Sequence, residues 1–281
     1  MRVVILGAGG QLGRELRREF PDAVALDRAA LDLADGAAVA GFDWTGVDVV
    51  LNAAAYTQVD AAEDSANLAA VRAVNVDAVG HLADAARRTG FTLVHLSSEY
   101  VFDGTCPGPI PENLAPSPLS VYGQSKADGD AHAARAERHY LIRTTWLVGE
   151  GQNFVRTMAS LAERGVSPAV VDDQIGRPTF TPDLAAGIRH LLETAAPFGT
   201  YNLSGAGEPA SWADVATAVY TARGHGADEV RRVSTAEYFA DKPGAARRPL
   251  NSVLDLAKIE ATEFRPRNWR AGLTDYLAGL G

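Results

Sequence analysis

Short apolar runs alternate with amphipathic stretches through the first half of the chain. The apolar runs predict strands at residues 2–6, 23–26, 47–51, 92–96 and 140–143, and helical spacing predicts helices at residues 11–20, 68–88 and 120–138. Such alternation is typical of a parallel sheet covered by helices on both faces. We therefore expect an α/β fold with a Rossmann-like doubly wound parallel sheet, in which ligands bind beyond the carboxyl ends of the strands.

Glycine and proline interrupt the second half of the chain, and its pattern is less regular. It predicts short strands at residues 169–171 and 200–203, and helices at residues 182–194, 211–221 and 268–280. We expect a small C-terminal substrate-binding lobe whose loops fold over the mouth of the sheet. Residues 1–145 then form mainly the Rossmann domain and residues 146–281 mainly the lobe, with some segments returning to the Rossmann domain.

Composition excludes several classes of partner. The net charge is −9 and the basic residues are scattered, so the chain lacks the clustered cations that nucleic-acid binding requires. No apolar run approaches the roughly 20 residues of a membrane-spanning helix. The single cysteine, Cys106, can form no internal disulfide, and we expect a reducing, cytoplasmic setting.

A glycine-rich turn, GAGGQLG, follows the first predicted strand. Gly7 permits a tight turn, Gly10 lets the backbone approach a pyrophosphate, and Gly13 allows close packing of helix on sheet. The N–H groups at the start of the next helix favour that anion. Asp27 ends the second strand, where an acid binds the ribose 2′-hydroxyl of NAD, but the adjacent Arg28 suits the 2′-phosphate of NADP. The pattern therefore leaves both cofactors open.

Tyr122 and Lys126 are the candidate catalytic pair. They lie four residues apart at the start of a predicted helix, so both side chains project from one face. A phenol with a pKa near 10 is a weak acid at neutral pH, and a nearby ammonium is expected to lower that pKa. The phenol can then protonate a carbonyl oxygen while hydride arrives at the carbon. Ser98, at the end of the fourth strand, is expected to bind the same oxygen, in preference to Ser97.

Motifs spread over nearly the whole chain carry a family resemblance. They are the glycine turn and residues 52–60, 97–104, 122–126, 143–146, 153–155, 173–179 and 247–252. On these motifs the chain resembles the extended short-chain dehydrogenase/reductase superfamily and, within it, the family of dTDP-4-dehydrorhamnose reductases. The later motifs are the more specific ones, because the superfamily at large does not share them.

The resemblance implies a reaction in which NADPH or NADH reduces the 4-keto group of dTDP-4-dehydro-β-L-rhamnose to dTDP-β-L-rhamnose. Tyr122 would donate the proton, Lys126 would bind the nicotinamide ribose, and Ser98 would orient the carbonyl. Trp146 would stack on the sugar or base, and Arg248 or Arg247 would bind the diphosphate. The candidate substrate contacts are Ser98, Glu99, Tyr100, Val101, Tyr122, Trp146, Asn153, Gln174, Arg247 and Arg248.

Candidate cofactor contacts come from the glycine turn and from the ends of the next three strands. Alanines after the third strand leave room for the cofactor to lie across the sheet, and Asn75 is expected to support the backbone or a proton-relay water, unless it faces solvent. The set is Gly7, Gly10, Gln11, Leu12, Gly13, Asp27, Arg28, Asp32, Leu33, Ala53, Ala54, Ala55, Tyr56, Asn75, Ser97, Tyr122 and Lys126.

Two departures from the family pattern bear on the site. Glu99 stands where the family usually has Asp, which keeps the charge and lengthens its reach. Glu15 occupies the place of a glutamate that binds Mg²⁺ in some dimeric members. No partner glutamates are evident near the C-terminus, so a metal-bridged dimer is not supported, and both a monomer and a homodimer stay open.

Other functions on the same framework are distinguishable. A dehydratase of this superfamily places a second acid directly after the first, where this chain has Tyr100. An epimerase would retain its cofactor tightly. A non-catalytic regulatory protein, similar to the regulatory subunit of methionine adenosyltransferase, would bind cofactor without turnover. The intact Tyr122, Lys126 and Ser98 favour a reductase.

Overall fold

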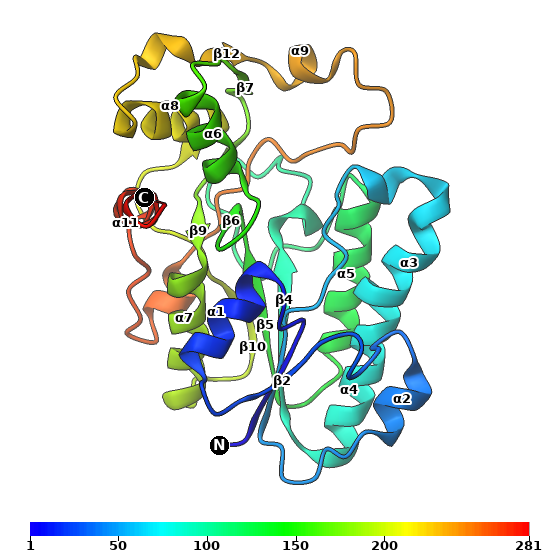
Figure 1. Cartoon of the computed structure of the whole chain (residues 1–281). Coiled ribbons are helices and arrows are strands. Elements are labelled where there is room, and N and C mark those ends of the chain that lie inside the picture. The colour runs from blue at the N-terminus through cyan, green and yellow to red at the C-terminus, as the bar shows by residue number, and fades with distance from the viewer. Residues whose placement is uncertain (281) are drawn as a thin grey trace.

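A computed structural model of the chain describes residues 1–280. Its centre is a sheet of six parallel strands (Figure 1). In spatial order the strands are β10 (Gly199–Asn202), β5 (His139–Thr144), β4 (Thr92–Ser98), β3 (Val49–Asn52), β1 (Val3–Leu6) and β2 (Val24–Leu26). The predicted Rossmann-like α/β fold is therefore confirmed.

Helices cover both faces of this sheet because its central strands are apolar on both sides. On one face lie α1 (Gln11–Glu19) and α7 (Thr181–Glu193), and on the other lie α2 (Gly36–Gly41), α4 (Ala78–Thr89) and α5 (Val121–Ala133) (Figure 1). In β1, Val3 and Ile5 belong to the core shared with α1 and α7. Val4 and Leu6 belong to the core shared with α4. This alternation explains why β1 reads as an unbroken apolar run.

A continuous helical run covers the predicted residues 68–88, but it is not a regular α-helix throughout. The segment forms α3 (Leu68–Arg72), a π-helical turn η3 (Ala73–Asp77) and then α4, after the short 3₁₀ turns η1 (Ala61–Glu63) and η2 (Ser65–Asn67). A π turn accommodates an extra residue in the helix. The turn carries Asn75, whose side chain is buried, so the interruption serves a polar contact that helical periodicity does not reveal.

The C-terminal lobe packs around a separate apolar core. Its helices are α6 (Phe154–Glu163), α8 (Trp212–Ala222), α9 (Thr235–Phe239) and α11 (Trp269–Ala278), with the 3₁₀ turn η5 (Ala227–Glu229). Helix α10 (Ala257–Glu260) packs instead on the Rossmann half, where Ile259 belongs to the core shared with α1 and α7. Its strands are β6 (Leu147–Val148), β7 (Ala169–Val171), β8 (Ile175–Gly176), β9 (Thr179–Phe180), β11 (Ala210–Ser211) and β12 (Arg231–Val233). Most of these strands are too short to leave a periodic pattern. Helix α6 was not predicted, although its buried residues have helical spacing.

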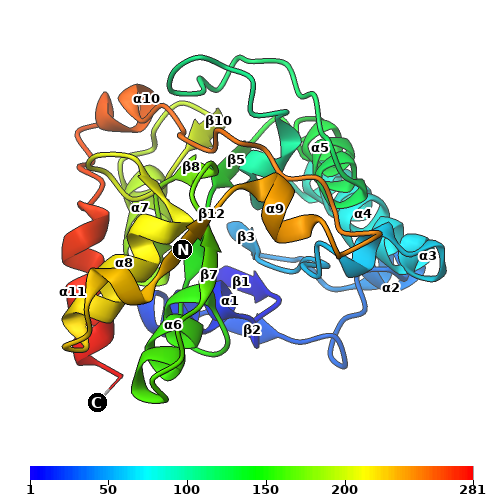
Figure 2. The ribbon, with the colours of Figure 1, turned by 90° about the horizontal axis from the view of Figure 1, so that it is seen from above.

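The chain passes between the two halves more than once. After β6 and α6 in the lobe it returns to add α7 and β10 to the Rossmann half, where β10 pairs with β5. Seen from above, α9 crosses over the carboxyl ends of the strands (Figure 2). Among residues 1–280, no helix combines the length and the apolar character needed to cross a membrane.

The sheet reverses its order beside β1. The chain runs from β1 outward to β2, and β3 then lies on the other side of β1 and leads on to β4. In doubly wound sheets, ligands bind at the carboxyl ends of the strands at such a switch point. The turn after β1 and the segment after β3 are therefore the first places to look for a site.

Candidate active site

The glycine turn connects β1 to α1. Gly7 has a left-handed φ of +72°, and its carbonyl accepts a hydrogen bond from the N–H of Gly10 at 3.0 Å. A Cβ at Gly13 would lie 2.1 Å from the Gly7 carbonyl oxygen, so only glycine lets α1 sit this close to β1. No side chain caps the N-terminus of α1. Its first N–H groups are therefore available to an anion such as a pyrophosphate.

A cleft of about 570 Å³ opens beside this turn. Small residues at the end of β3, Ala53 and Ala55, leave its floor open. The predicted cofactor contacts that line it are Gly10, Gln11, Leu12, Ala53, Ala55, Ser97, Tyr122 and Lys126. Gly7, Gly13, Ala54 and Tyr56 belong to the same segments without lining the cleft. The residues present thus fit an extended dinucleotide with its pyrophosphate at α1.

The predicted contacts beyond β2 lie apart from this lining. Asp27, Arg28, Asp32 and Leu33 follow β2 and are not among the described residues that line the cleft. Arg28 is exposed and pairs with Asp32 at 3.4 Å. One carboxylate oxygen of Asp27 accepts hydrogen bonds from the next backbone N–H groups, at 3.0 and 2.9 Å, and so holds the turn after β2.

Asn75 supports the backbone of the segment after β3. Its Oδ1 accepts from the N–H of Tyr56 at 2.8 Å, and its Nδ2 donates to the Tyr56 carbonyl at 3.1 Å and to Ser125 Oγ at 3.0 Å. The side chain is 1% exposed, so it does not face solvent. The structure thus places Asn75 behind the cofactor cleft, with its amide engaged by Tyr56.

Ser98, Tyr122 and Lys126 all line the inner part of the cleft. Ser98 ends β4 and caps the 3₁₀ turn η4 (Glu99–Val101). Ser120 caps α5, and Tyr122 and Lys126 follow in its first two turns. The Tyr122 phenol lies close enough to the Ser98 hydroxyl for the serine to affect its pKa. The structure therefore brings the three predicted catalytic residues to one place.

The environment keeps Tyr122 protonated. Burial raises the pKa of Tyr122, the negative charge of Glu99 raises it further, and the Ser98 hydroxyl opposes both. We expected Lys126 to lower this pKa, but burial outweighs any such effect here. A phenol that holds its proton at neutral pH is in the form that a proton donor requires.

Lys126 is engaged on the side away from solvent. Its Nζ donates to the Leu96 carbonyl at 2.6 Å and lies 3.4 Å from Nε2 of His95. The other ring nitrogen of His95 lies 3.1 Å from Nδ2 of Asn52. Burial lowers the pKa of Lys126 to about 8. Burial, together with the Lys126 charge, lowers the pKa of His95 well below its usual range, so His95 is neutral.

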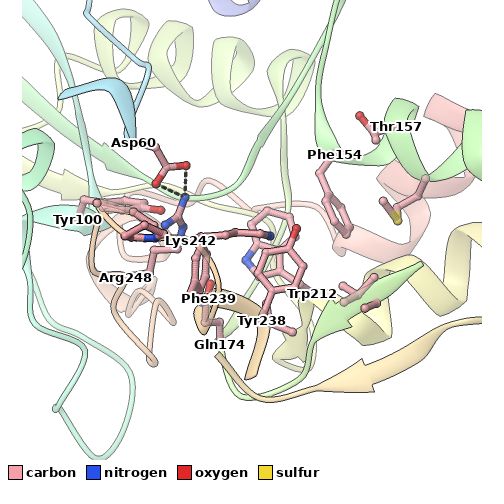
Figure 3. A pocket seen from close by; sticks show the side chains of 17 residues that line it. Asp60, Tyr100, Phe154, Thr157, Gln174, Trp212, Tyr238, Phe239, Lys242 and Arg248 are labelled. Carbon is pink, nitrogen blue, oxygen red and sulfur yellow. Dashed lines mark hydrogen bonds and ion pairs between the residues drawn. The ribbon is translucent and has the colours of Figure 1, made fainter. Parts of the chain in front are cut away.

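A second cavity of about 600 Å³ adjoins the cleft, and the two share Tyr100 and Trp212 in their linings. Three predicted substrate contacts, Tyr100, Gln174 and Arg248, line it (Figure 3). Gln174 Nε2 donates to Thr235 Oγ1 at 3.0 Å. A ligand that filled both cavities would therefore run from the cationic Arg248 past Tyr100 to Ser98 and Tyr122.

Trp146 lies between the lobe and the cleft. It lines the cleft and stacks on Trp212 with ring centroids 3.8 Å apart and an interplanar angle of 16°. Its left-handed φ of +47° is unusual for a non-glycine residue. The indole predicted to stack on a ligand thus has another indole on one face.

Four other predicted residues lie outside both cavities. Arg247 is exposed, Val101 is buried in a small apolar core, and Asn153 caps α6 while its Nδ2 donates to Gly149 O and Tyr276 Oη. Glu15 accepts a hydrogen bond from Arg18 at 3.0 Å. Among residues 1–280, no group of three or more metal-ligating side chains is placed to hold a metal.

Sequence reasoning missed part of the second cavity. The missed lining residues come from the loop after β3, from α6, β7 and α8, and from the segment that carries α9. They include Asp60, Phe154, Trp212, Tyr238, Phe239 and Lys242 (Figure 3). Only the fold brings these segments together. The adjacent aromatics Tyr238 and Phe239, in an otherwise polar segment, were the signal available in the sequence.

The chain is similar to known proteins over its whole length. The family model described as the RmlD substrate binding domain matches residues 1–281. A dTDP-4-dehydrorhamnose reductase of Aggregatibacter actinomycetemcomitans is 37% identical, over 99% of this chain and 98% of the relative. A solved dTDP-4-dehydrorhamnose reductase of Clostridium acetobutylicum is 34% identical, with a TM-score of 0.91, over 100% of this chain and 99% of that one. Another, from Bacillus anthracis in complex with NADP, is 32% identical, with a TM-score of 0.90, over 99% of both chains.

Proposed function

Since the chain belongs to the RmlD substrate binding domain family, we propose that it reduces the 4-keto group of dTDP-4-dehydro-β-L-rhamnose to dTDP-β-L-rhamnose. The reductant is NADPH or NADH, and Tyr122 donates the proton. Residues 1–145 hold mainly the cofactor, and residues 146–281 supply mainly the substrate pocket. The names of its relatives and the NADP in the Bacillus anthracis structure support this assignment.

One observation carries the proposal. Ser98 and Tyr122 line the cleft that begins at the glycine turn, and that cleft meets the second cavity at Tyr100 and Trp212. A cofactor bound along the cleft and a sugar nucleotide bound in the second cavity would thus meet beside the phenol and the hydroxyl. A reductase needs this arrangement, because hydride and proton must reach neighbouring atoms of one carbonyl group.

The protein's own residues manage the proton. Tyr122 donates to the keto oxygen as negative charge develops there. Ser98 hydrogen-bonds the same oxygen and opposes the raised pKa of Tyr122. Lys126, held by the Leu96 carbonyl, would bind the nicotinamide ribose. When bound, the nicotinamide cofactor supplies the hydride.

The glycine turn binds the cofactor, and the lobe binds the nucleotide-sugar substrate. The free N–H groups of α1 bind the cofactor pyrophosphate. In the second cavity Arg248 binds the substrate diphosphate, and the aromatic rings of Trp212 and Phe239 offer flat apolar surface to the base and sugar. Gln174 supplies an amide for hydrogen bonds.

A coupled assay tests the function. The 4-keto-6-deoxysugar nucleotide is made in situ by a 4,6-dehydratase and a 3,5-epimerase, and oxidation of NADPH or NADH is followed at saturating cofactor. We expect oxidation that depends on both the nucleotide sugar and this protein, with dTDP-β-L-rhamnose as product. No turnover with either cofactor would overturn the proposal, and a different sugar product would redirect it.

A further inference from the structure

The carboxyl group of Glu99 is buried beside the Ser98 hydroxyl and forms a hydrogen bond with it. Glu99 is 2% exposed, and its Oε2 lies 2.7 Å from Ser98 Oγ. A hydroxyl has one proton to donate, and a carboxylate can only accept. While Glu99 is ionised, the Ser98 proton is therefore committed to Glu99. The Tyr100 N–H, 3.3 Å from Ser98 Oγ, is itself a donor and cannot take that proton.

In the proposed reduction, Ser98 must donate the same proton to the keto oxygen, so the keto oxygen competes with Glu99 for that hydrogen bond. A buried carboxylate that loses a hydrogen bond is strongly destabilised, so an ionised Glu99 keeps the proton. A protonated Glu99 reverses the bond. Its own O–H then donates to Ser98 Oγ, and the Ser98 proton is free to turn into the cleft.

We propose that Glu99 is a positioning residue that acts through Ser98. In its protonated form it directs the Ser98 hydroxyl toward the substrate carbonyl, and in its ionised form it withdraws that hydroxyl from the substrate. This inference rests on the proposed function, because the keto oxygen is the group that Ser98 would bind.

The groups around Glu99 determine the pH at which it loses its proton. Burial raises the pKa of Glu99 to about 7, opposed first by the Ser98 hydroxyl and then by the Glu99 backbone N–H and the Thr145 hydroxyl. The other titratable groups that line the cleft are Arg14, Tyr100, Tyr122, Lys126 and Glu150. Tyr122 and Tyr100 feel the Glu99 charge directly, and Arg248 and Asp60 face Tyr100 from the second cavity.

The sign of the pH dependence follows. Glu99 is protonated below its pKa, so the productive direction of the Ser98 bond is present below about pH 7 and is lost as pH rises through that value. Ionisation of Glu99 also raises the pKa of Tyr122, which opposes proton donation in the same direction. Burial lowers the pKa of Lys126 to about 8, so Lys126 adds a fall of its own, and the contribution of Glu99 is identified by comparing variants.

The test compares kcat/KM across pH for the wild type, Glu99→Gln and Glu99→Asp, with NADPH and preformed nucleotide sugar. In Glu99→Gln the amide N–H₂ can donate to Ser98 at every pH, so we expect the fall near pH 7 to disappear and the remaining fall to lie near pH 8. Glu99→Asp should retain a carboxylate-dependent fall. Glu163→Gln, the same change on the exposed face of α6, should leave the profile unchanged. A Glu99→Gln profile with the same midpoint as that of the wild type would overturn the inference.

A second measurement needs no substrate, so it separates this inference from the proposed function. Infrared difference spectra of wild type minus Glu99→Gln should show a protonated carboxyl band that titrates near pH 7. Ser98→Ala should shift the frequency of that band, because it removes the hydrogen-bond partner. If the wild type reduces no nucleotide sugar, the proposed function fails while these spectra still decide the Glu99–Ser98 coupling. A Glu99 band that is absent below pH 7, or unmoved by Ser98→Ala, contradicts the coupling.

Discussion

Nη2 of Arg248 donates to both carboxylate oxygens of Asp60, at 2.9 and 2.8 Å (Figure 3). Burial raises the pKa of Asp60, but Arg248, the Ala246 N–H and the charge of Lys242 together more than offset it. The pKa therefore lies below its ordinary value, and the pair is ionised at neutral pH. The pair joins the loop after β3 to the segment after α9. It therefore fixes the guanidinium at the wall of the second cavity before a substrate binds.

Arg248→Ala should raise KM for the nucleotide sugar with little change in KM for NADPH. Loss of a charged hydrogen bond costs about 1.5–3 kcal/mol, or roughly ten- to a hundredfold in affinity. The matched control is Arg247→Ala, because Arg247 is exposed and outside both cavities. Steady-state kinetics with each substrate varied in turn measure both. A larger effect from Arg247→Ala would assign the diphosphate to that residue instead.

Tyr122→Phe should lower kcat by roughly 10²–10⁴-fold, the usual contribution of a general acid, while the Kd for NADPH changes little. Cofactor binding is followed by fluorescence titration and turnover by single-turnover absorbance. The control is Tyr140→Phe, which also removes a buried phenol, one that donates to backbone carbonyls far from the cleft. It should cost roughly 0.5–1.5 kcal/mol of stability and leave kcat unchanged. A near-normal rate for Tyr122→Phe would remove it from the role of acid.

Gly13→Ala should weaken NADPH binding and lower the free energy of unfolding together. The new Cβ would lie 2.1 Å from Gly7 O, so α1 must move away from β1 and carry its N–H groups with it. Overpacking of this kind typically costs about 1–3 kcal/mol. Gly41→Ala in α2 meets no atom within 4 Å and should be neutral or stabilising by roughly 0.5–1 kcal/mol. Urea unfolding and calorimetric NADPH titration distinguish the two variants.

Asn75→Ala should act on stability first. It leaves the part-buried N–H and carbonyl of Tyr56 without their side-chain partner, and each lost hydrogen bond costs about 0.5–1.5 kcal/mol. The exposed Asn113→Ala should stay within about 0.5 kcal/mol of the wild type. Chemical denaturation measures both variants. Weaker NADPH binding at unchanged stability would instead indicate that Asn75 contacts the cofactor directly.

Much of the Rossmann half could be predicted from local pattern. Apolar runs such as residues 3–6 are buried on both faces of the sheet, as their composition predicts. The glycine turn is a short motif, and so is the Tyr122–Lys126 pair, so the geometry of each follows from the spacing of its own residues. The second cavity could not be predicted from the sequence, because segments far apart along the chain form it. Asp60 meets Arg248 across 188 residues, and Trp146 stacks on Trp212. No short-range pattern encodes either contact.

Some residues were found but placed differently. The sequence identifies Asn75 as a polar residue on an alanine-rich face of a helix. Its hydrogen bond with the Tyr56 backbone is known only from the structure, in which Asn75 lies in a π turn. Asn153 and Arg247 belong to specific motifs and still lie outside the cavities. A motif identifies residues that a family shares, whereas the direction of each side chain depends on caps and turns that the motif does not specify.

The position of β10 has a consequence for synthesis of the protein. Its partner β5 ends at Thr144, but β10 begins only at Gly199, after β6 and α6 of the lobe have been made. During synthesis, the outer edge of β5 therefore has no partner strand until more than fifty further residues have been translated. An open strand edge is a template for intermolecular pairing, and nascent intermediates with such edges aggregate readily. Truncation before residue 199 should thus yield insoluble protein rather than a free-standing cofactor domain.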